Sequence, residues 1–85
     1  MIRRPTTRGV GTIAYSCTNA IEIAHEVVAY YGYTHVEVHE VEWEEEDNRW
    51  EVELRAFRPD RTAFEITVDA VTGEVLRVEH ERDDG

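Results

Sequence analysis

Residues 64–76 read Phe-Glu-Ile-Thr-Val-Asp-Ala-Val-Thr-Gly-Glu-Val-Leu, and this stretch decides the fold. Its first six residues alternate apolar with polar side chains, which is the period of a half-buried β-strand. Asp69 and Thr72 can then accept hydrogen bonds from backbone N–H groups of a turn, and Gly73 tolerates a positive φ. A second strand beginning at Val75 would return antiparallel to the first. The stretch therefore predicts a β-hairpin.

Two segments upstream of this hairpin show the same alternation. Apolar and charged residues alternate over 50–56. Over 36–43 the alternation slips by one residue at Glu40, which is the effect of a β-bulge. Polar turn residues follow each of these segments, at Glu44–Asn48 and at Arg58–Arg61. Together with the hairpin, the chain is predicted to have four short, consecutive strands.

A helix is predicted over about 17–31, ahead of the strands. Ser16 is a good N-cap residue, and Asn19 with Glu22 is a competing cap. Gly32 provides the left-handed residue that ends a helix. The apolar residues of the segment recur at helical spacing and form one stripe, namely Ala20, Ile23, Ala24, Val27, Val28 and Tyr31.

The predicted fold class is α+β, with one N-terminal helix packed on one face of a four-stranded antiparallel meander sheet. Short connections make consecutive strands neighbours, and the apolar stripe of the helix can cover one sheet face. The predicted core residues of that face are Trp50, Val52, Leu54, Phe64, Ile66, Val68, Leu76 and Val78. The domain is predicted over 16–82, after a flexible arm over 1–15 that contains a short extended segment, and before a tail over 83–85.

The hairpin resembles the closing hairpin of PepSY domains, in which a strand is followed by Asp-Ala-x-Thr-Gly-Glu-Val and a last strand. Trp50–Leu54 resembles the central strand of that family, and Ser16–Ala24 resembles its opening helix, so the resemblance covers about residues 16–80. It implies a regulatory or inhibitory module, of the kind named for peptidase propeptides and often located outside the membrane. It implies no shared catalytic residues.

The composition is strongly acidic, with a net charge of −10, and all the basic residues are arginines. An acidic surface repels phosphate groups, so binding to nucleic acids or to anionic membranes is not expected. A high acidic content without lysine is typical of salt-loving or high-GC organisms. No export signal or membrane-spanning stretch is found, which predicts a cytoplasmic protein, with a mature fragment whose signal was removed as the alternative.

The polar side of the predicted sheet is the candidate partner surface. Its candidate residues are Glu37, Glu51, Glu53, Arg55, Glu65, Arg77 and Glu79. Such a surface is either a docking site for a basic partner or the solvated face of a one-sided antiparallel sheet, and the second interpretation is the more common one. Edge strands are a further route to a homodimer or to another protein.

The remaining candidates for chemistry are weak. His35 and His39 lie about 13 Å apart if they share a strand, which is too far for one metal ion. Cys17 is a single cysteine and can form no internal disulfide, although a helix N-terminus can activate a thiol. No catalytic, metal or cofactor site is predicted. The predicted function is a non-enzymatic interaction or regulatory module, with a peptidase inhibitor acting in trans as the alternative and an enzyme using Cys17 as a third.

Overall fold

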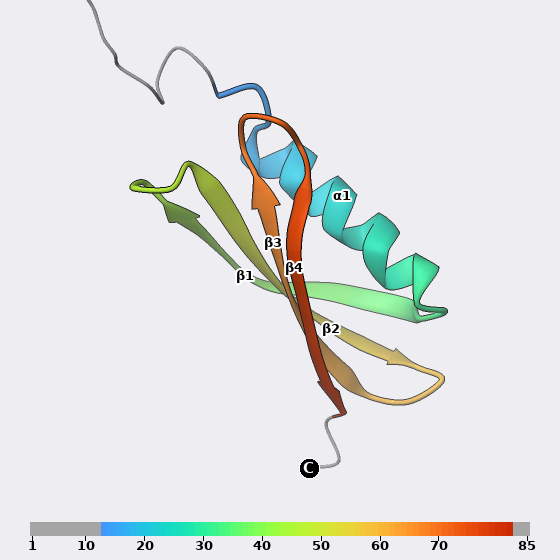
Figure 1. Ribbon diagram of the computed structural model, residues 1–85. Helices are drawn as coiled ribbons and strands as arrows, with labels where there is room; N and C mark the ends of the chain where they lie inside the picture. The colour runs from blue at the N-terminus through green and yellow to red at the C-terminus, as the bar shows by residue number, and fades with distance from the viewer. Residues whose placement is uncertain (1–12, 83–85) are drawn as a thin grey trace, which may run out of the picture.

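One helix and a four-stranded sheet make up the fold (Figure 1). The structure is a computed structural model that describes residues 13–82. Its elements are α1 (Cys17–Tyr30), β1 (Thr34–Glu44), β2 (Arg49–Arg58), β3 (Thr62–Asp69) and β4 (Val75–Arg82). The strands pair antiparallel in the order β1-β2-β3-β4, so the predicted meander and fold class are confirmed. Residues 1–12 of the predicted arm and the predicted tail lie outside the described residues.

The helix begins at a reciprocal cap. The Asn19 N–H donates to Ser16 Oγ at 3.2 Å, and the Ser16 N–H donates to Asn19 Oδ1 at 3.0 Å. Ser16 is therefore the N-cap, and the competing cap at Asn19 with Glu22 is wrong because Asn19 serves as the third helical residue. Gly32 has φ +92° just after the C-cap Tyr31, as predicted, and the helix ends one residue earlier than expected.

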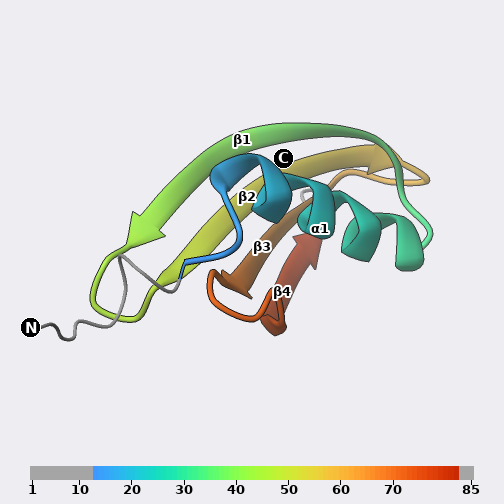
Figure 2. The ribbon, with the colours of Figure 1, turned by 90° about the horizontal axis from the view of Figure 1, so that it is seen from above.

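The core lies between α1 and the sheet, which curves around the helix (Figure 2). The helix buries its small residues, Ala20 and Ala24, together with Val28, and all three are fully inaccessible to solvent. Small side chains let the helix approach the sheet closely. The largest buried partners on the sheet are Val52, Leu54, Phe64, Ile66 and Val68.

Two β-bulges adjust which side chains enter this core. The predicted bulge in β1 is confirmed by a register shift between Val38 and Glu40, after which Val41 lies opposite Val52. A second shift, in the β3–β4 pairing, was not predicted: Val68 pairs with Val75, whereas Thr67 pairs with Arg77. The extra residue is Leu76, which is 43% exposed, so its predicted place in the core is wrong.

The residues just before the helix are hydrogen-bonded to the end of the sheet that carries the turn between β3 and β4. The N–H groups of Ala14 and Tyr15 donate to the Ala70 carbonyl at 3.0 and 2.9 Å. The Tyr15 carbonyl in turn accepts a 2.9 Å hydrogen bond from Trp50 Nε1. The Tyr15 ring packs against Gly73, in the turn between β3 and β4. This anchor fixes the helix N-terminus against the closing hairpin.

The closing turn has the predicted construction. Asp69 Oδ1 accepts hydrogen bonds from the N–H groups of Val71 and Thr72 at 2.7 and 3.1 Å. Thr72 Oγ1 accepts from the Glu74 N–H at 3.1 Å, and Gly73 has φ +80°. The Asp, Thr and Gly residues of the stretch are thus turn-forming residues.

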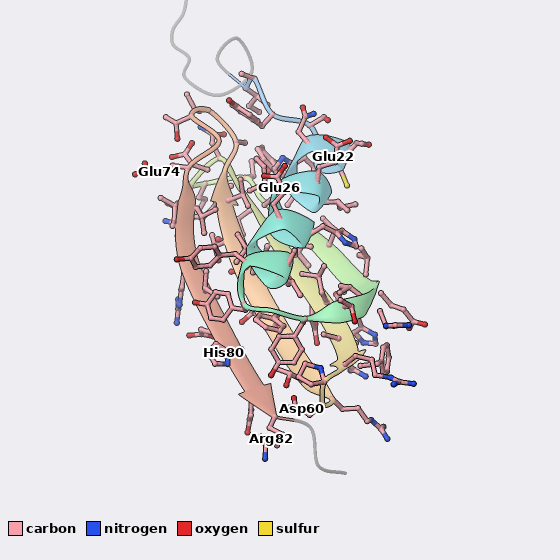
Figure 3. The ribbon with its side chains drawn as sticks, turned by 90° about the vertical axis from the view of Figure 1, so that its right-hand side faces the viewer. Glu22, Glu26, Asp60, Glu74, His80 and Arg82 are labelled. Atoms are coloured by element: carbon pink, nitrogen blue, oxygen red, sulfur yellow. The ribbon has the colours of Figure 1, made fainter. Side chains whose placement is uncertain are left out.

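The opposite end of the sheet is held by Asp60. Thr62 Oγ1 and Tyr33 Oη donate to Asp60 Oδ1 at 2.7 and 3.0 Å, and Arg82 lies 3.5 Å from Asp60 Oδ2. These hydrogen bonds, with a smaller contribution from the Arg82 charge, lower the pKa of Asp60. Figure 3 shows Asp60 and Arg82 together at this end. The contacts connect the α1–β1 loop, the β2–β3 turn and the end of β4.

Candidate functional site

The candidate surface is the sheet face that points away from α1, called here the outer face. Along β2 the buried residues Val52, Leu54 and Ala56 point to the helix, so the residues between them point outward. The strand register places all seven predicted surface residues on the outer face: Glu37, Glu51, Glu53, Arg55, Glu65, Arg77 and Glu79. The structure thus brings them onto one surface. They belong to several rows of paired residues that run across the strands.

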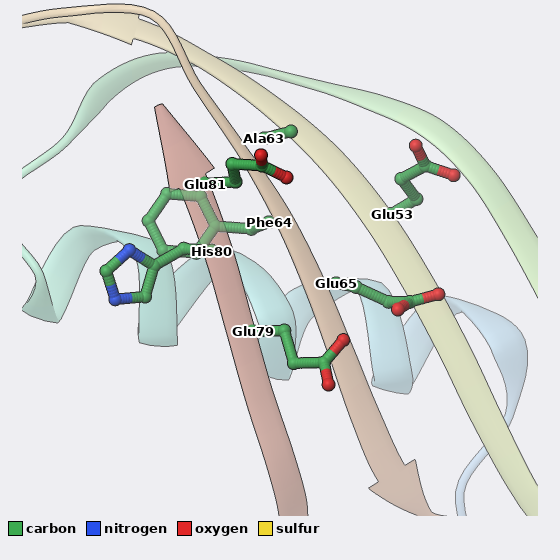
Figure 4. Close-up of a pocket in the computed structure, with 7 residues that line it drawn as sticks. All are labelled: Glu53, Ala63, Phe64, Glu65, Glu79, His80 and Glu81. Carbon is green, nitrogen blue, oxygen red and sulfur yellow. The ribbon is translucent and has the colours of Figure 1, made fainter. Parts of the chain in front are cut away.

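One row consists only of carboxylates. Glu40 pairs with Glu53 across β1 and β2, Glu53 pairs with Glu65, and Glu65 pairs with Glu79 on β4. We call these four residues the glutamate row. Figure 4 shows three of them, Glu53, Glu65 and Glu79, on neighbouring strands. Like charges directly opposite each other destabilise a sheet, so this row has an energetic cost at neutral pH.

The adjacent row continues the acidic surface and ends in a cation. Glu42 pairs with Glu51, Glu51 pairs with Thr67, and Thr67 pairs with Arg77. Thr67 is only 3% exposed although it lies on the outer face. Part of the outer face is therefore inaccessible to solvent.

The closeness of the carboxyl groups to one another raises the pKa of several of them. A hydrogen bond with Glu44, followed by burial and nearby carboxylates, raises the pKa of Glu51 from 4.5 to about 7. Burial first, and then Glu79 and Glu53, raise the pKa of Glu65. A hydrogen bond with Glu40 is the main cause that raises the pKa of Glu42. Each shift shows that the charged form is disfavoured by its surroundings.

Few cations offset these charges. Arg77 Nε donates to Glu79 Oε2 at 3.0 Å, so the β4 end of the glutamate row is paired with a cation. Arg55 lies 3.5 Å from His39 Nε2 and pairs across the strands with Glu37, one step beyond the row. The middle of the row has no directly paired arginine in the register of the described strands.

Two hollows open on or beside this face. One, of about 250 Å³, is lined only by carboxylates, namely Glu40, Glu42, Glu51, Glu53 and Glu65. The other, of about 430 Å³, lies over β3 and β4 (Figure 4). Its wall combines glutamates with Phe64 and His80, whose rings are 5.4 Å apart.

The other candidates remain separate. The antiparallel strand order places His35 and His39 on one edge strand and His80 on the opposite one. Among residues 13–82, no three His, Cys, Asp or Glu side chains are grouped so that they could hold a metal ion. Cys17 is a free, partly buried thiol at the first residue of α1. Within the same residues, no helix is long and apolar enough to span a membrane.

Glu40 and Glu42 are outer-face residues that the sequence prediction missed. The β1 bulge moves them onto the face that also carries Glu37. The sequence contained the necessary signal, because the alternation slips at Glu40. Because the slip shifts the polar residues together with Val41 and Trp43, it indicates that both glutamates point outward.

The raised pKa of Glu51 predicts a pH-dependent stability. Between pH 4.5 and about 7, the folded state keeps a proton that the unfolded state has released. The free energy of unfolding should therefore fall as the pH rises through this range and level off above it. Glu51→Gln should flatten the profile and raise the free energy of unfolding at pH 8 by about 1 kcal/mol, allowing for solvent screening.

Urea denaturation at a series of pH values measures this effect. Glu22→Gln is the matched control, since it removes the same charge from an exposed residue of α1, on the other side of the molecule from the outer face. An E51Q profile that keeps the wild-type slope between pH 4.5 and 7 would contradict the assignment.

The comparisons with known proteins agree with this geometry. No curated protein and no solved structure is significantly similar to the chain. A family model does match, the PepSY model described as peptidase propeptide and YPEB domain, over residues 16–79. Domains of this family are generally non-catalytic, propeptide-like modules. The match spans the helix and most of the sheet, so the chain belongs to the PepSY domain family.

Proposed function

We propose that this PepSY domain is a non-enzymatic interaction and regulatory module whose outer face binds a basic region of another protein. The supporting observation is the glutamate row, in which four carboxylates from four adjacent strands stand side by side. The raised pKa values of Glu51 and Glu65 indicate that ionising this face is unfavourable. A bound cation would offset that cost, so the face is better suited to a positively charged partner than to water alone.

The dimensions of the row suit a short basic segment. Neighbouring strands lie about 4.8 Å apart, so four carboxylates extend over roughly 15 Å. Two or three arginine or lysine side chains on a helix or an extended segment can reach this distance. The hollow lined by five glutamates includes three residues of the row and gives such a side chain a place to enter.

An NMR titration of the domain with hexa-arginine tests the proposal. The amide shifts are expected to be largest in β2 and β3 around Glu53 and Glu65. The double variant E53Q/E65Q should weaken binding by about tenfold, because two carboxylates in the middle of the row lose their charge. The same double change also relieves repulsion, so the variant remains folded.

A matched control removes the same charge from the opposite side. Glu22 and Glu26 are exposed on α1 (Figure 3), and E22Q/E26Q should change the affinity by less than about twofold. Equal weakening by both double variants would show that only the net charge matters. That result, or shifts spread evenly over the helix, would count against a site on the outer face.

A peptidase inhibitor acting in trans is the second candidate, and the description of the matched family favours it. A thermolysin-type protease, assayed with and without an excess of the domain, tests it directly. Concentration-dependent inhibition supports the candidate if the domain itself stays intact. Unchanged proteolysis at high domain concentration removes it without affecting the proposal for the outer face.

A further inference from the structure

The sheet ends in two edge strands, β1 and β4. The strand order leaves one side of each without a pairing strand among residues 13–82. Unpaired backbone N–H and C=O groups on an edge can pair with a strand of another molecule. The two edges differ in how well they suit such pairing.

The β1 edge is poorly suited to a second copy. It has a bulge between Val38 and Glu40, and His35 near its start has a positive φ of 59°. Both features interrupt a regular ladder. Its outward charges also have one sign only, and two copies paired here would place carboxylates against carboxylates. These residues are Glu37, Glu40, Glu42 and Glu44.

The β4 edge is regular over most of its length and carries both signs of charge. After the bulge at Leu76, residues 77–82 pair with β3 without a further shift. Their outward-facing residues begin with Arg77 and continue with Glu79 and Glu81. A strand that carries both signs of charge can be complementary to an antiparallel copy of itself.

The helix side of β4 is also less covered than the rest of the sheet. The helix α1 packs mainly against β1, β2 and β3. Beside β4, Tyr31 is 43% exposed and its ring lies 5.3 Å from that of His80; the neighbouring Tyr30, whose ring is 6.2 Å from that of Tyr31, is 89% exposed. An aromatic surface therefore borders the open edge, where a neighbouring molecule would bury it.

We propose that a second copy of this chain pairs with β4 through its own β4, in antiparallel orientation about a two-fold axis at Val78. Such an axis, normal to the sheet, keeps both helices on the same side and continues the outer face across both copies. With the axis at Val78, Arg77 of each copy lies opposite the partner's Glu79. Within 77–79 the pairing forms two opposite-charge contacts and no like-charge contact. Beyond these residues, His80 lies opposite the partner's Leu76 at the bulge, so the regular ladder between the copies is short and the charges at 77 and 79 select the register.

The alternative registers are less favourable. When the two-fold axis moves by one residue, the pairing of the two strands shifts by two residues, which keeps outward-facing residues opposite outward-facing residues. The axis can therefore also pass through Glu79 or His80. An axis through Glu79 also forms two opposite-charge contacts, between Arg77 and the partner's Glu81, but it adds a like-charge contact between Glu79 and the partner's Glu79. An axis through His80 places Glu79 against the partner's Glu81 on both sides. Charge complementarity therefore selects the register centred on Val78.

The net charge sets the conditions under which the dimer forms. Each chain carries −10, so two copies repel each other at long range. Added salt screens this repulsion more strongly than it weakens contacts at the interface. Dimerisation should consequently strengthen as the ionic strength rises from low to physiological values. The dimer forms without the basic partner proposed for the outer face.

Sedimentation equilibrium over a range of protein concentrations tests the proposal. The wild-type chain should approach twice its mass of 9.9 kDa. Arg77→Glu should weaken dimerisation by about tenfold or more, since both opposite-charge contacts become repulsive. The double variant R77E/E79R should restore it to within about threefold of wild type, because each new glutamate lies opposite a new arginine. An equimolar mixture of R77E and E79R should associate about as well as wild type, although each variant alone should associate at least about tenfold more weakly.

Arg61→Glu is the matched control, since it makes the same charge change at an exposed residue in the turn before β3. Circular dichroism of each variant checks that the fold is kept. A wild-type chain that stays monomeric at millimolar concentration overturns the proposal. A dimer that R77E leaves unchanged places the interface elsewhere, and a double variant that fails to recover excludes the Val78 register.

Discussion

Phe64→Ala is expected to lower the free energy of unfolding by about 3–5 kcal/mol. Phe64 is 1% exposed and is the largest fully buried side chain among the described residues. Its ring makes edge contacts with Tyr31 and Tyr33, with ring centroids 5.6 and 5.4 Å apart. Removing it leaves a cavity that the small residues of α1 cannot fill. A domain of this size is typically stable by roughly 4–13 kcal/mol, so the loss is a large fraction of the total.

Two control variants separate burial from aromatic contact. Phe64→Leu keeps most of the volume and should cost about 1–1.5 kcal/mol. Phe57→Ala makes the same chemical change at a side chain that is 37% exposed, and should cost less than about 1 kcal/mol. Urea denaturation followed by tryptophan fluorescence measures all three. Equal losses for F64A and F57A would show that Phe64 is not the centre of the core.

Gly73→Ala is expected to be the second most destabilising change, with a loss of about 2–3 kcal/mol. The backbone has φ +80° at this residue, where an alanine is strained. In addition, its Cβ would lie 2.5 to 2.9 Å from three ring atoms of Tyr15. The ring would have to move, and it belongs to the segment that attaches the helix N-terminus to Ala70 and Trp50.

Gly32→Ala isolates the contribution of Tyr15. Gly32 has φ +92°, but no atom lies within 4 Å of the position that an alanine Cβ would occupy, so only the backbone strain applies, about 1 kcal/mol. The excess loss in G73A should disappear when the comparison is repeated in a Tyr15→Ala background. Thermal denaturation of the four variants tests this, and equal losses for G73A and G32A in the wild-type background would refute the role of the ring.

The candidate surface was partly predictable for a simple reason. Residues that alternate with a buried row must point away from it, so Glu51, Glu53 and Glu65 could be assigned to the outer face from the period of the sequence. Their cross-strand neighbours could not. Whether Glu65 faces a carboxylate or an arginine depends on the strand register, and a shift of two residues would exchange these neighbours while keeping the same faces.

The sequence alone determined the helix, its end at Gly32, the four strands, the β1 bulge and the closing turn. These features depend on local backbone preferences and on the period of apolar residues, which act over a few positions. Only the tertiary structure decided the rest. In the folded chain the Tyr15 ring packs against Gly73, Leu76 lies outside the core, and the residues of the glutamate row lie opposite one another. Each of these depends on contacts between segments far apart in the chain, where packing and register select one arrangement among several that the local pattern permits equally.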